Sequence, residues 1–176
     1  MNNKIFIKNS LLDLKTLNLK EIKNYYHWFN NQNITKNMNK GHFPNDIEKQ
    51  SNFFKKISLS KNDIQLGIYQ KNKDKILGII SLHDINFIHR VASISIILGD
   101  SNYTNKGIGS ASIKLLCDHA FKKLNLRKLK AGMWKSNYAS RFAFEKNNFK
   151  KEAILKKEYE YNGKFIDSLI LSKFNN

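Results

Sequence analysis

The segment at residues 104–110, Thr-Asn-Lys-Gly-Ile-Gly-Ser, combines two glycines with a lysine and could bind the phosphates of a ligand. Gly107 and Gly109 let the backbone approach an anion, and the first amides of a helix beginning there lack partners within the helix. The helix dipole favours a pyrophosphate at that end, and Lys106 adds a positive charge. The segment has no Gly-Lys-Ser/Thr of a Walker loop, and Ser112 stands where a dinucleotide fingerprint has its third glycine. A tight strand-to-helix turn without a ligand is the alternative interpretation.

This segment needs a strand before it and a helix after it. Residues 92–98 form an isoleucine-rich run that predicts a strand. Residues 110–124 carry apolar side chains at helical spacing, which predicts a helix with one apolar face. A strand, a glycine-bearing turn and a helix N-terminus together form the cradle that a pyrophosphate requires.

Further elements surround this unit. Helices are predicted at residues 19–30, 47–59 and 137–146, and strands at residues 5–14, 64–69, 76–82, 128–134, 153–161 and 165–171. Asn45-Asp46 can cap the second helix, and Asn162-Gly163 predicts a type I′ turn between the last two strands. The order indicates one α/β (α+β) domain over residues 1–176, with a mostly antiparallel sheet flanked by helices.

The composition indicates a globular protein and excludes several classes. Hydrophobic residues make up 41% of the 176 residues, which suffices for one core. No apolar run approaches the ~18 residues of a membrane span. The single cysteine, Cys117, falls on the core face of a helix and fits a reducing cytoplasm. The net charge of +17 comes from dispersed lysines, so we expect anionic ligands but no dedicated nucleic-acid role, and no metal site.

Three blocks of the sequence resemble, in the same order, the GCN5-related N-acetyltransferase (GNAT) superfamily. Residues 104–109 match the register of its acetyl-CoA loop, Gln/Arg-x-x-Gly-x-Gly/Ala, with Thr104 in place of Gln or Arg. Residues 137–149 resemble its Asn-x-x-Ser/Ala-x-x-x-Tyr/Phe-Glu-Lys-x-Gly-Phe segment, with Asn148 in place of the glycine. The closing hairpin at residues 161–167 resembles the branch of ribosomal-protein N-terminal acetyltransferases and nucleotide-amino-sugar N-acetyltransferases.

The resemblance implies acetyl-CoA (coenzyme A) as the cofactor, and a twisted GNAT-like sheet that splays between its fourth and fifth strands, at residues 92–98 and 128–134. Backbone groups of the fourth strand would hold the pantetheine arm, with an amide near Ile96 or Ile97 as the oxyanion donor. Asn137 would contact the same arm, and a helix N-cap is its alternative role. The implied cofactor-binding residues are Ile96, Ile97, Leu98, Thr104, Asn105, Lys106, Gly107, Ile108, Gly109, Ser110, Asn137, Phe144 and Lys146.

Acetyl transfer also requires a proton donor for the departing thiolate and an acceptor for the amine proton. Many relatives have a tyrosine as the general acid where this chain has Phe144. The resemblance therefore implies Ser140 as the proton donor to the thiolate, and Tyr138 is the second candidate. His83 and Asp84, at the end of a strand, are the candidates for relaying the amine proton. The alternatives are a helix-surface serine for Ser140 and turn structure for the other two.

The acceptor is expected between the first helices and the last hairpin. Trp28, Asn30 and Asn31 offer an aromatic face and amides there, or else form a core helix end with a polar break. The favoured function is acetyl transfer from acetyl-CoA, by direct attack in a ternary complex, to the primary amine of a nucleotide-linked amino sugar. Protein N-terminal acetylation and a non-catalytic acyl-CoA-binding module are the alternatives. The positive charge disfavours a polyamine, and the sequence leaves a homodimer open.

Overall fold

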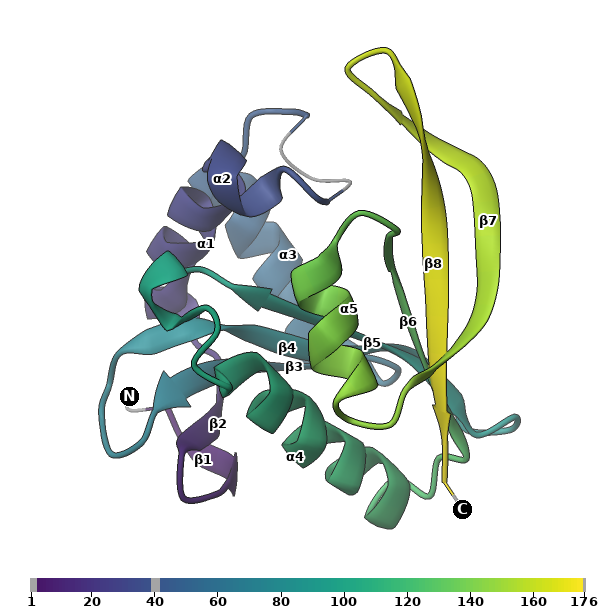
Figure 1. The fold of residues 1–176 in the computed structure, drawn as a ribbon. Helices are drawn as coiled ribbons and strands as arrows, with labels where there is room; N and C mark the ends of the chain where they lie inside the picture. The colour runs from purple at the N-terminus through teal and green to yellow at the C-terminus, as the bar shows by residue number, and fades with distance from the viewer. Residues whose placement is uncertain (1–2, 39–41, 176) are drawn as a thin grey trace.

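The computed structural model describes residues 3–38 and 42–175, which contain one eight-stranded sheet with helices on both faces (Figure 1). The strands follow the spatial order β1-β2-β3-β4-β5-β6-β8-β7, and all neighbours are antiparallel except the parallel pair β5 and β6. Their bounds are Ile5–Lys8 (β1), Leu12–Thr16 (β2), Ile64–Gln70 (β3), Ile76–Asn86 (β4), Val91–Leu98 (β5), Lys128–Trp134 (β6), Lys150–Tyr161 (β7) and Lys164–Phe174 (β8). The expected mixed, mostly antiparallel fold is confirmed.

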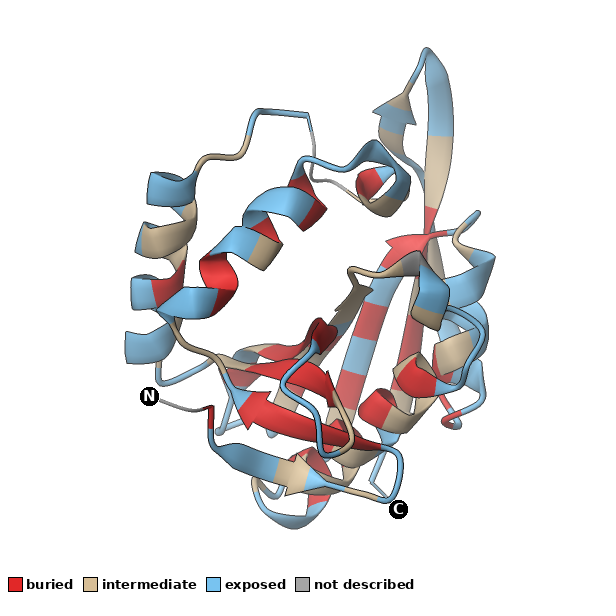
Figure 2. Ribbon diagram, turned by 90° about the vertical axis from the view of Figure 1, so that its left-hand side faces the viewer, coloured by how far each residue is buried: buried red, intermediate tan, exposed pale blue. Residues whose placement is uncertain are grey.

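The helices form two layers because alternate strand residues point to opposite faces of the sheet. The α-helices are α1 (Ile22–Phe29), α2 (Gln32–Thr35), α3 (Ile47–Leu59), α4 (Ile108–Lys122) and α5 (Tyr138–Glu145), with 3-10 turns η1 (Leu19–Glu21) and η2 (Ser101–Tyr103). Ile80 and Ile96 pack with α4 and α5, whereas their neighbours Ile79 and Ile97 pack with α1 and α3. Buried residues accordingly mark the strands and the helix sides that face them (Figure 2).

The sheet parts between β5 and β6, as the splayed arrangement requires. The two strands pair only at Val91–Lys128, Ala92–Leu129 and Ser93–Lys130 in the described part of the chain. Beyond Ser93, β5 keeps its pairing with β4, and β6 keeps its pairing with β8 as far as Trp134. One edge of β5 and the facing edge of β6 therefore border a wedge, which opens toward the carboxyl ends of both strands.

One local prediction about the N-terminal region was wrong. The strand expected at residues 5–14 is a hairpin of β1 and β2, because the Asn9 side chain accepts hydrogen bonds from the Leu11 and Leu12 amides, both at 2.8 Å, and turns the chain. The break expected after residue 30 is present, because α1 ends at Phe29 and Asn31 caps a separate short helix, α2. Side-chain hydrogen bonds of asparagine explain both the turn at Asn9 and the cap at Asn31.

Other local signals were confirmed. Asp46 caps α3 by accepting the Lys49 amide at 2.7 Å. Asn148, Asn162 and Gly163 all have positive φ, as the helix end and the hairpin turn require. Cys117 lies in the core as expected, and burial raises the pKa of its thiol to about 12. No helix within residues 3–38 and 42–175 has the length and apolar character needed to cross a bilayer.

Candidate active site

The turn between β5 and α4 presents an open helix N-terminus. Gly107 is the N-cap of α4, with a φ of 76°, and as a glycine it has no side chain with which to cap the helix. A Cβ placed on Gly107 would meet no atom within 4 Å, so the space beside it is open. The amides of Ile108, Gly109 and Ser110 lie in the first turn, where they cannot have partners within the helix. These are the donors that a diphosphate uses at a helix N-terminus.

The rest of this loop lies on the surface. Thr104, Asn105 and Lys106 are exposed, and Asn105 has a φ of 60°. The Lys106 ammonium lies 5.5 Å from the ring centre of Tyr103, and the Lys75 ammonium lies 4.9 Å from the same ring. The loop therefore carries the positive charge of Lys106 next to the helix N-terminus, which favours a phosphorylated ligand, whereas the Lys75 ammonium is paired with Asp100 at 3.0 Å.

The edge of β5 along the wedge offers backbone rather than side chains. Ile96 and Leu98 pack against the core under α4, and Ile97 packs against the core under α1. With those side chains engaged, the backbone groups that face β6 are the part available to an extended ligand. These residues fit a pantetheine arm that pairs with the strand edge, with the diphosphate at Gly107.

The residues of α5 and its two caps that were expected to bind the cofactor or donate a proton differ in burial and in their contacts. Asn137 is the N-cap of α5, since its side chain accepts the Ser140 amide at 3.2 Å. Ser140 is half-buried in the first turn, and Lys146 is exposed at the C-cap. Phe144 is 2% exposed and lies edge-on to Phe149 with ring centres 5.0 Å apart. The Phe144 side chain therefore belongs to the core, which corrects the expectation that it faces the cofactor.

Replacing Asn137 would separate its capping role from a cofactor contact. Asn137→Ser keeps a capping oxygen and loses the amide donor, so we expect about 10-fold weaker acetyl-CoA binding, about 1.4 kcal/mol, with stability retained. Asn137→Ala loses the cap as well and should destabilise the protein by about 1 kcal/mol. Calorimetric titration and urea unfolding would measure the two effects. Unchanged affinity in Asn137→Ser would confine this residue to capping.

His83 belongs to a connected set of polar side chains at the end of β4. Its Nε2 lies 2.8 Å from the Oγ of Ser95 on β5, and its Nδ1 lies 3.6 Å from an Oδ1 of Asp63. The Ser60 hydroxyl donates to Asp63 at 2.6 Å, and this hydrogen bond is the main cause of a lowered pKa of the Asp63 carboxyl. Asp84 joins through its backbone, because its amide donates to Asp63 at 3.3 Å. The His83 side chain thus lies between Ser95 and Asp63, whereas Asp84 takes part through its backbone amide rather than its carboxylate.

Asp63 and Ser95 were missed by the sequence analysis. The register that reveals them follows from the hairpin of β3 and β4, in which Ile64 pairs with Leu82, so that Asp63 falls opposite His83. The pairing of His83 with Ser93 then places Ser95 diagonally across the strands. The strand register points to both positions, but the bulge that turns the Asp84 amide toward Asp63 has no such signal in the sequence.

The residues expected to bind the acceptor all have structural partners. Trp28 is 7% exposed, stacks on Tyr25 and contacts Gly99 so closely that a Cβ at Gly99 would overlap its ring. This burial corrects the expectation of an open stacking face. Asn30 bonds the Tyr26 carbonyl and both backbone groups of Asn45. Asn31 caps α2, so the side chains of Asn30 and Asn31 both stabilise the polar break between α1 and α2.

A different group of aromatic residues lies where the acceptor is expected. Trp134, the last residue of β6, contacts Tyr159 and Tyr161 on β7, with ring centres 6.1 and 5.3 Å apart. His42, from the segment before α3, lies 6.2 Å from the Tyr161 ring. We call these four residues the aromatic cluster. It joins the helical N-terminal region to the last hairpin at the open end of the wedge.

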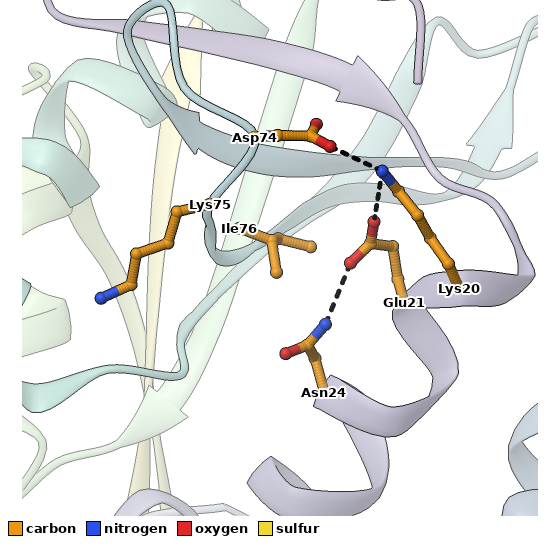
Figure 3. Close-up of a pocket in the computed structure, with 6 residues that line it drawn as sticks. All are labelled: Lys20, Glu21, Asn24, Asp74, Lys75 and Ile76. Atoms are coloured by element: carbon orange, nitrogen blue, oxygen red, sulfur yellow. Dashed lines mark hydrogen bonds and ion pairs between the residues drawn. The ribbon is translucent and has the colours of Figure 1, made fainter. Parts of the chain in front are cut away.

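A separate pocket of 310 Å³ lies outside the wedge, between the start of α1 and the turn joining β3 to β4 (Figure 3). Lys20 pairs there with Asp74 at 2.9 Å and with Glu21 at 3.9 Å, and Asn24 donates to Glu21 at 3.0 Å. Glu21 is buried and also accepts hydrogen bonds from Asn3 and the Tyr69 hydroxyl. These charged groups are paired with one another within the protein, so we interpret the residues around the pocket as a structural hydrogen-bond network rather than a ligand site.

Comparison with known proteins agrees with this geometry. A sequence model of the family described as "Acetyltransferase (GNAT) domain" matches residues 12–150, most of the chain. The chain belongs to the GNAT acetyltransferases. Membership confirms the resemblance to the GNAT superfamily, and the matched range contains the first two of the three sequence blocks, at residues 104–109 and 137–149.

Individual GNAT relatives cover different shares of the chain. It is 32% identical over 114 residues to the probable N-acetyltransferase YjcK of Bacillus subtilis, covering 64% of this chain and 62% of YjcK, less than two thirds of that relative. It is 26% identical to the spermidine N(1)-acetyltransferase of Vibrio cholerae over 90% of both chains. Among solved structures, the microcin C7 self-immunity acetyltransferase MccE, in complex with acetyl-CoA and AMP, aligns with a TM-score of 0.81 and 25% identity, covering 95% of this chain and 94% of MccE.

Proposed function

We propose that this GNAT protein transfers the acetyl group of acetyl-CoA, by direct attack in a ternary complex, to the primary amine of a small molecule that carries a nucleotide. A nucleotide-linked amino sugar is the acceptor that we favour. The aromatic cluster carries this proposal, because the rings of His42, Tyr159 and Tyr161 gather at the open end of the wedge, where a planar base could pack against them. The net charge of +17 favours an anionic acceptor, and the complex of MccE with both acetyl-CoA and AMP supports a nucleotide as part of the acceptor.

The proposed chemistry needs three groups around the thioester. A backbone amide near Ile96 or Ile97 on the open edge of β5 would donate to the developing oxyanion. Ser140 would supply the proton for the departing thiolate, since it lies half-buried in the first turn of α5. Tyr138, the reserve candidate, is 72% exposed and would reach the thiolate only through water or after moving. His83 would take a proton from the amine.

A polyamine is the second candidate acceptor. The relative from Vibrio cholerae is a spermidine acetyltransferase, and the Asp63 carboxylate lies 3.6 Å from His83, where an ammonium group would arrive. Local acidity would favour the cation even though the protein as a whole repels it.

A panel of acceptors decides between these proposals. The protein would be mixed with acetyl-CoA and, separately, a nucleotide-linked amino sugar, the same amino sugar without its nucleotide, spermidine and a peptide with a free N-terminus. Thiol release would be followed with time. We expect the highest kcat/KM with the nucleotide-linked sugar and at least about 10-fold less without the nucleotide, equal to about 1.4 kcal/mol. Faster turnover of spermidine or of the peptide would replace the favoured acceptor, and acetyl-CoA binding without any turnover would indicate a binding module.

A further inference from the structure

We propose that Ser95, His83 and Asp63 form a proton relay that removes a proton from the ammonium group of the acceptor. In this relay the Ser95 hydroxyl contacts the amine, His83 accepts the proton, and Asp63 is a positioning residue that holds the imidazole. The inference rests on the proposed acetyl transfer and adds Ser95 and Asp63 to the site.

The first support is the geometry of the three side chains. His83 Nε2 lies at hydrogen-bond distance from Ser95 Oγ, 2.8 Å, and the opposite ring nitrogen faces Asp63 Oδ1 at 3.6 Å. A carboxylate on the Nδ1 side favours the tautomer with a proton on Nδ1, which leaves Nε2 free to accept from the serine hydroxyl. This is the order of groups that a base and its positioning residue require.

The second support is an irregularity of β4 at this point. The register between β4 and β5 shifts between His83 and Asn86, and Asp84 has a φ of 52°. That backbone turn aims the Asp84 amide at Asp63, while the Ile85 amide donates to the Asn62 carbonyl at 2.8 Å. The bulge therefore fixes Asp63 against the end of β4, and such irregularities commonly redirect side chains beside active sites.

The third support is the position of Ser95 relative to the wedge. β5 and β6 make their last pair at Ser93 and Lys130, and Ser95 is the next residue of β5 on the same face. Its side chain is exposed on the face where α1 and α3 pack, the side expected for the acceptor. A hydroxyl there stands beside the backbone that would carry the thioester, near the closed end of the wedge, just beyond the last pair of β5 and β6.

The protons balance as follows. An N–H of the ammonium donates to Ser95 Oγ as the serine proton moves to His83 Nε2, which leaves a neutral amine and an imidazolium that later returns its proton to water. The amine forms the new C–N bond to the acetyl carbon, the C–S bond breaks, and the second amine proton goes to the thiolate through Ser140 or water. No oxidant or further reactant is needed.

The test compares variants by kcat and by KM for acetyl-CoA, using spermidine and a nucleotide-linked amino sugar as acceptors. We expect His83→Ala to lower kcat about 100-fold with KM for acetyl-CoA unchanged, and added imidazole to restore about 10-fold of the loss. Ser95→Ala should also lower kcat, whereas Ser95→Thr, which keeps the hydroxyl, should retain it. Asp63→Asn should lower kcat about 10-fold without changing KM for acetyl-CoA.

His89→Ala is the matched control, because His89 is an exposed histidine on the hairpin between β4 and β5 that the relay does not use. It should keep the wild-type kcat. A folded His83→Ala protein with wild-type kcat, or a loss that imidazole fails to restore, would overturn the relay. An acetyl group found on Ser95 by mass spectrometry, after mixing with acetyl-CoA alone, would also overturn it by making Ser95 a nucleophile. Wild-type protein that turns over no acceptor would overturn the proposed function itself, and the relay with it.

Discussion

Gly107→Glu is expected to weaken acetyl-CoA binding about 100-fold, equal to about 2.7 kcal/mol. The glycine is the N-cap of α4, and the open space beside it is where the diphosphate would approach the first amides of the helix. A glutamate there would block that approach and place a negative charge against the phosphates. Calorimetric titration with coenzyme A and acetyl-CoA would measure the loss.

Gly163→Glu is the matched control for this substitution. Gly163 also has a positive φ, 69°, and a Cβ there would also meet no atom within 4 Å, but it lies in the turn between β7 and β8. Both variants carry the same left-handed strain, about 1–2 kcal/mol, so any difference in coenzyme affinity reports on the site alone. Equal coenzyme affinity of the two folded variants would contradict the proposal that the diphosphate binds at the N-terminus of α4.

Gly78→Ala is expected to cost about 3 kcal/mol of folding stability. A Cβ at Gly78 would overlap the carbonyl oxygen of Ile97 and lie 3.0 Å from the Leu98 Cα, and both of these are backbone atoms that cannot rotate away. The pairing of β4 with the end of β5 would have to open, and the coenzyme loop begins just after that end. Urea unfolding followed by circular dichroism would measure the change in the free energy of unfolding.

Gly132→Ala provides the comparison. Gly132 lies in the neighbouring strand β6, and a Cβ there would meet only the Ile170 Cδ1, at an ordinary 3.4 Å. Removing glycine from a strand restricts the unfolded chain, so we expect stability to be unchanged or raised by about 0.5 kcal/mol. Similar destabilisation of the two variants would contradict the close approach at Gly78.

The sequence predicted the coenzyme side of the molecule well, because that side depends on local signals. The glycines of residues 104–110 specify the turn, the apolar spacing of α4 specifies the helix, and β6 was predicted with its observed bounds. A positive φ at Asn148 and the caps at Asp46 and Asn137 likewise follow from single residue types.

The acceptor side was harder to predict because it is assembled from residues far apart in the chain. Trp28 looked like a stacking surface, but its contact with Gly99 arises only when α1 packs on the sheet. The aromatic cluster joins His42 to Tyr161 across more than a hundred residues, which no periodic pattern reveals. Asp63 acquires its place from strand register and from a bulge, and a bulge has no dependable sequence signature.

The contact between Trp28 and Gly99 has a mechanical consequence. α1 cannot move toward the sheet without pressing on Gly99, the residue directly after β5, and the segment that leads to the proposed phosphate-binding turn starts there. The contact between Trp28 and Gly99 therefore links α1, on the side expected for the amine, to the loop proposed to bind the coenzyme. We therefore expect binding of the acceptor on the α1 side to change the affinity for the coenzyme, and by thermodynamic reciprocity the two effects would be equal.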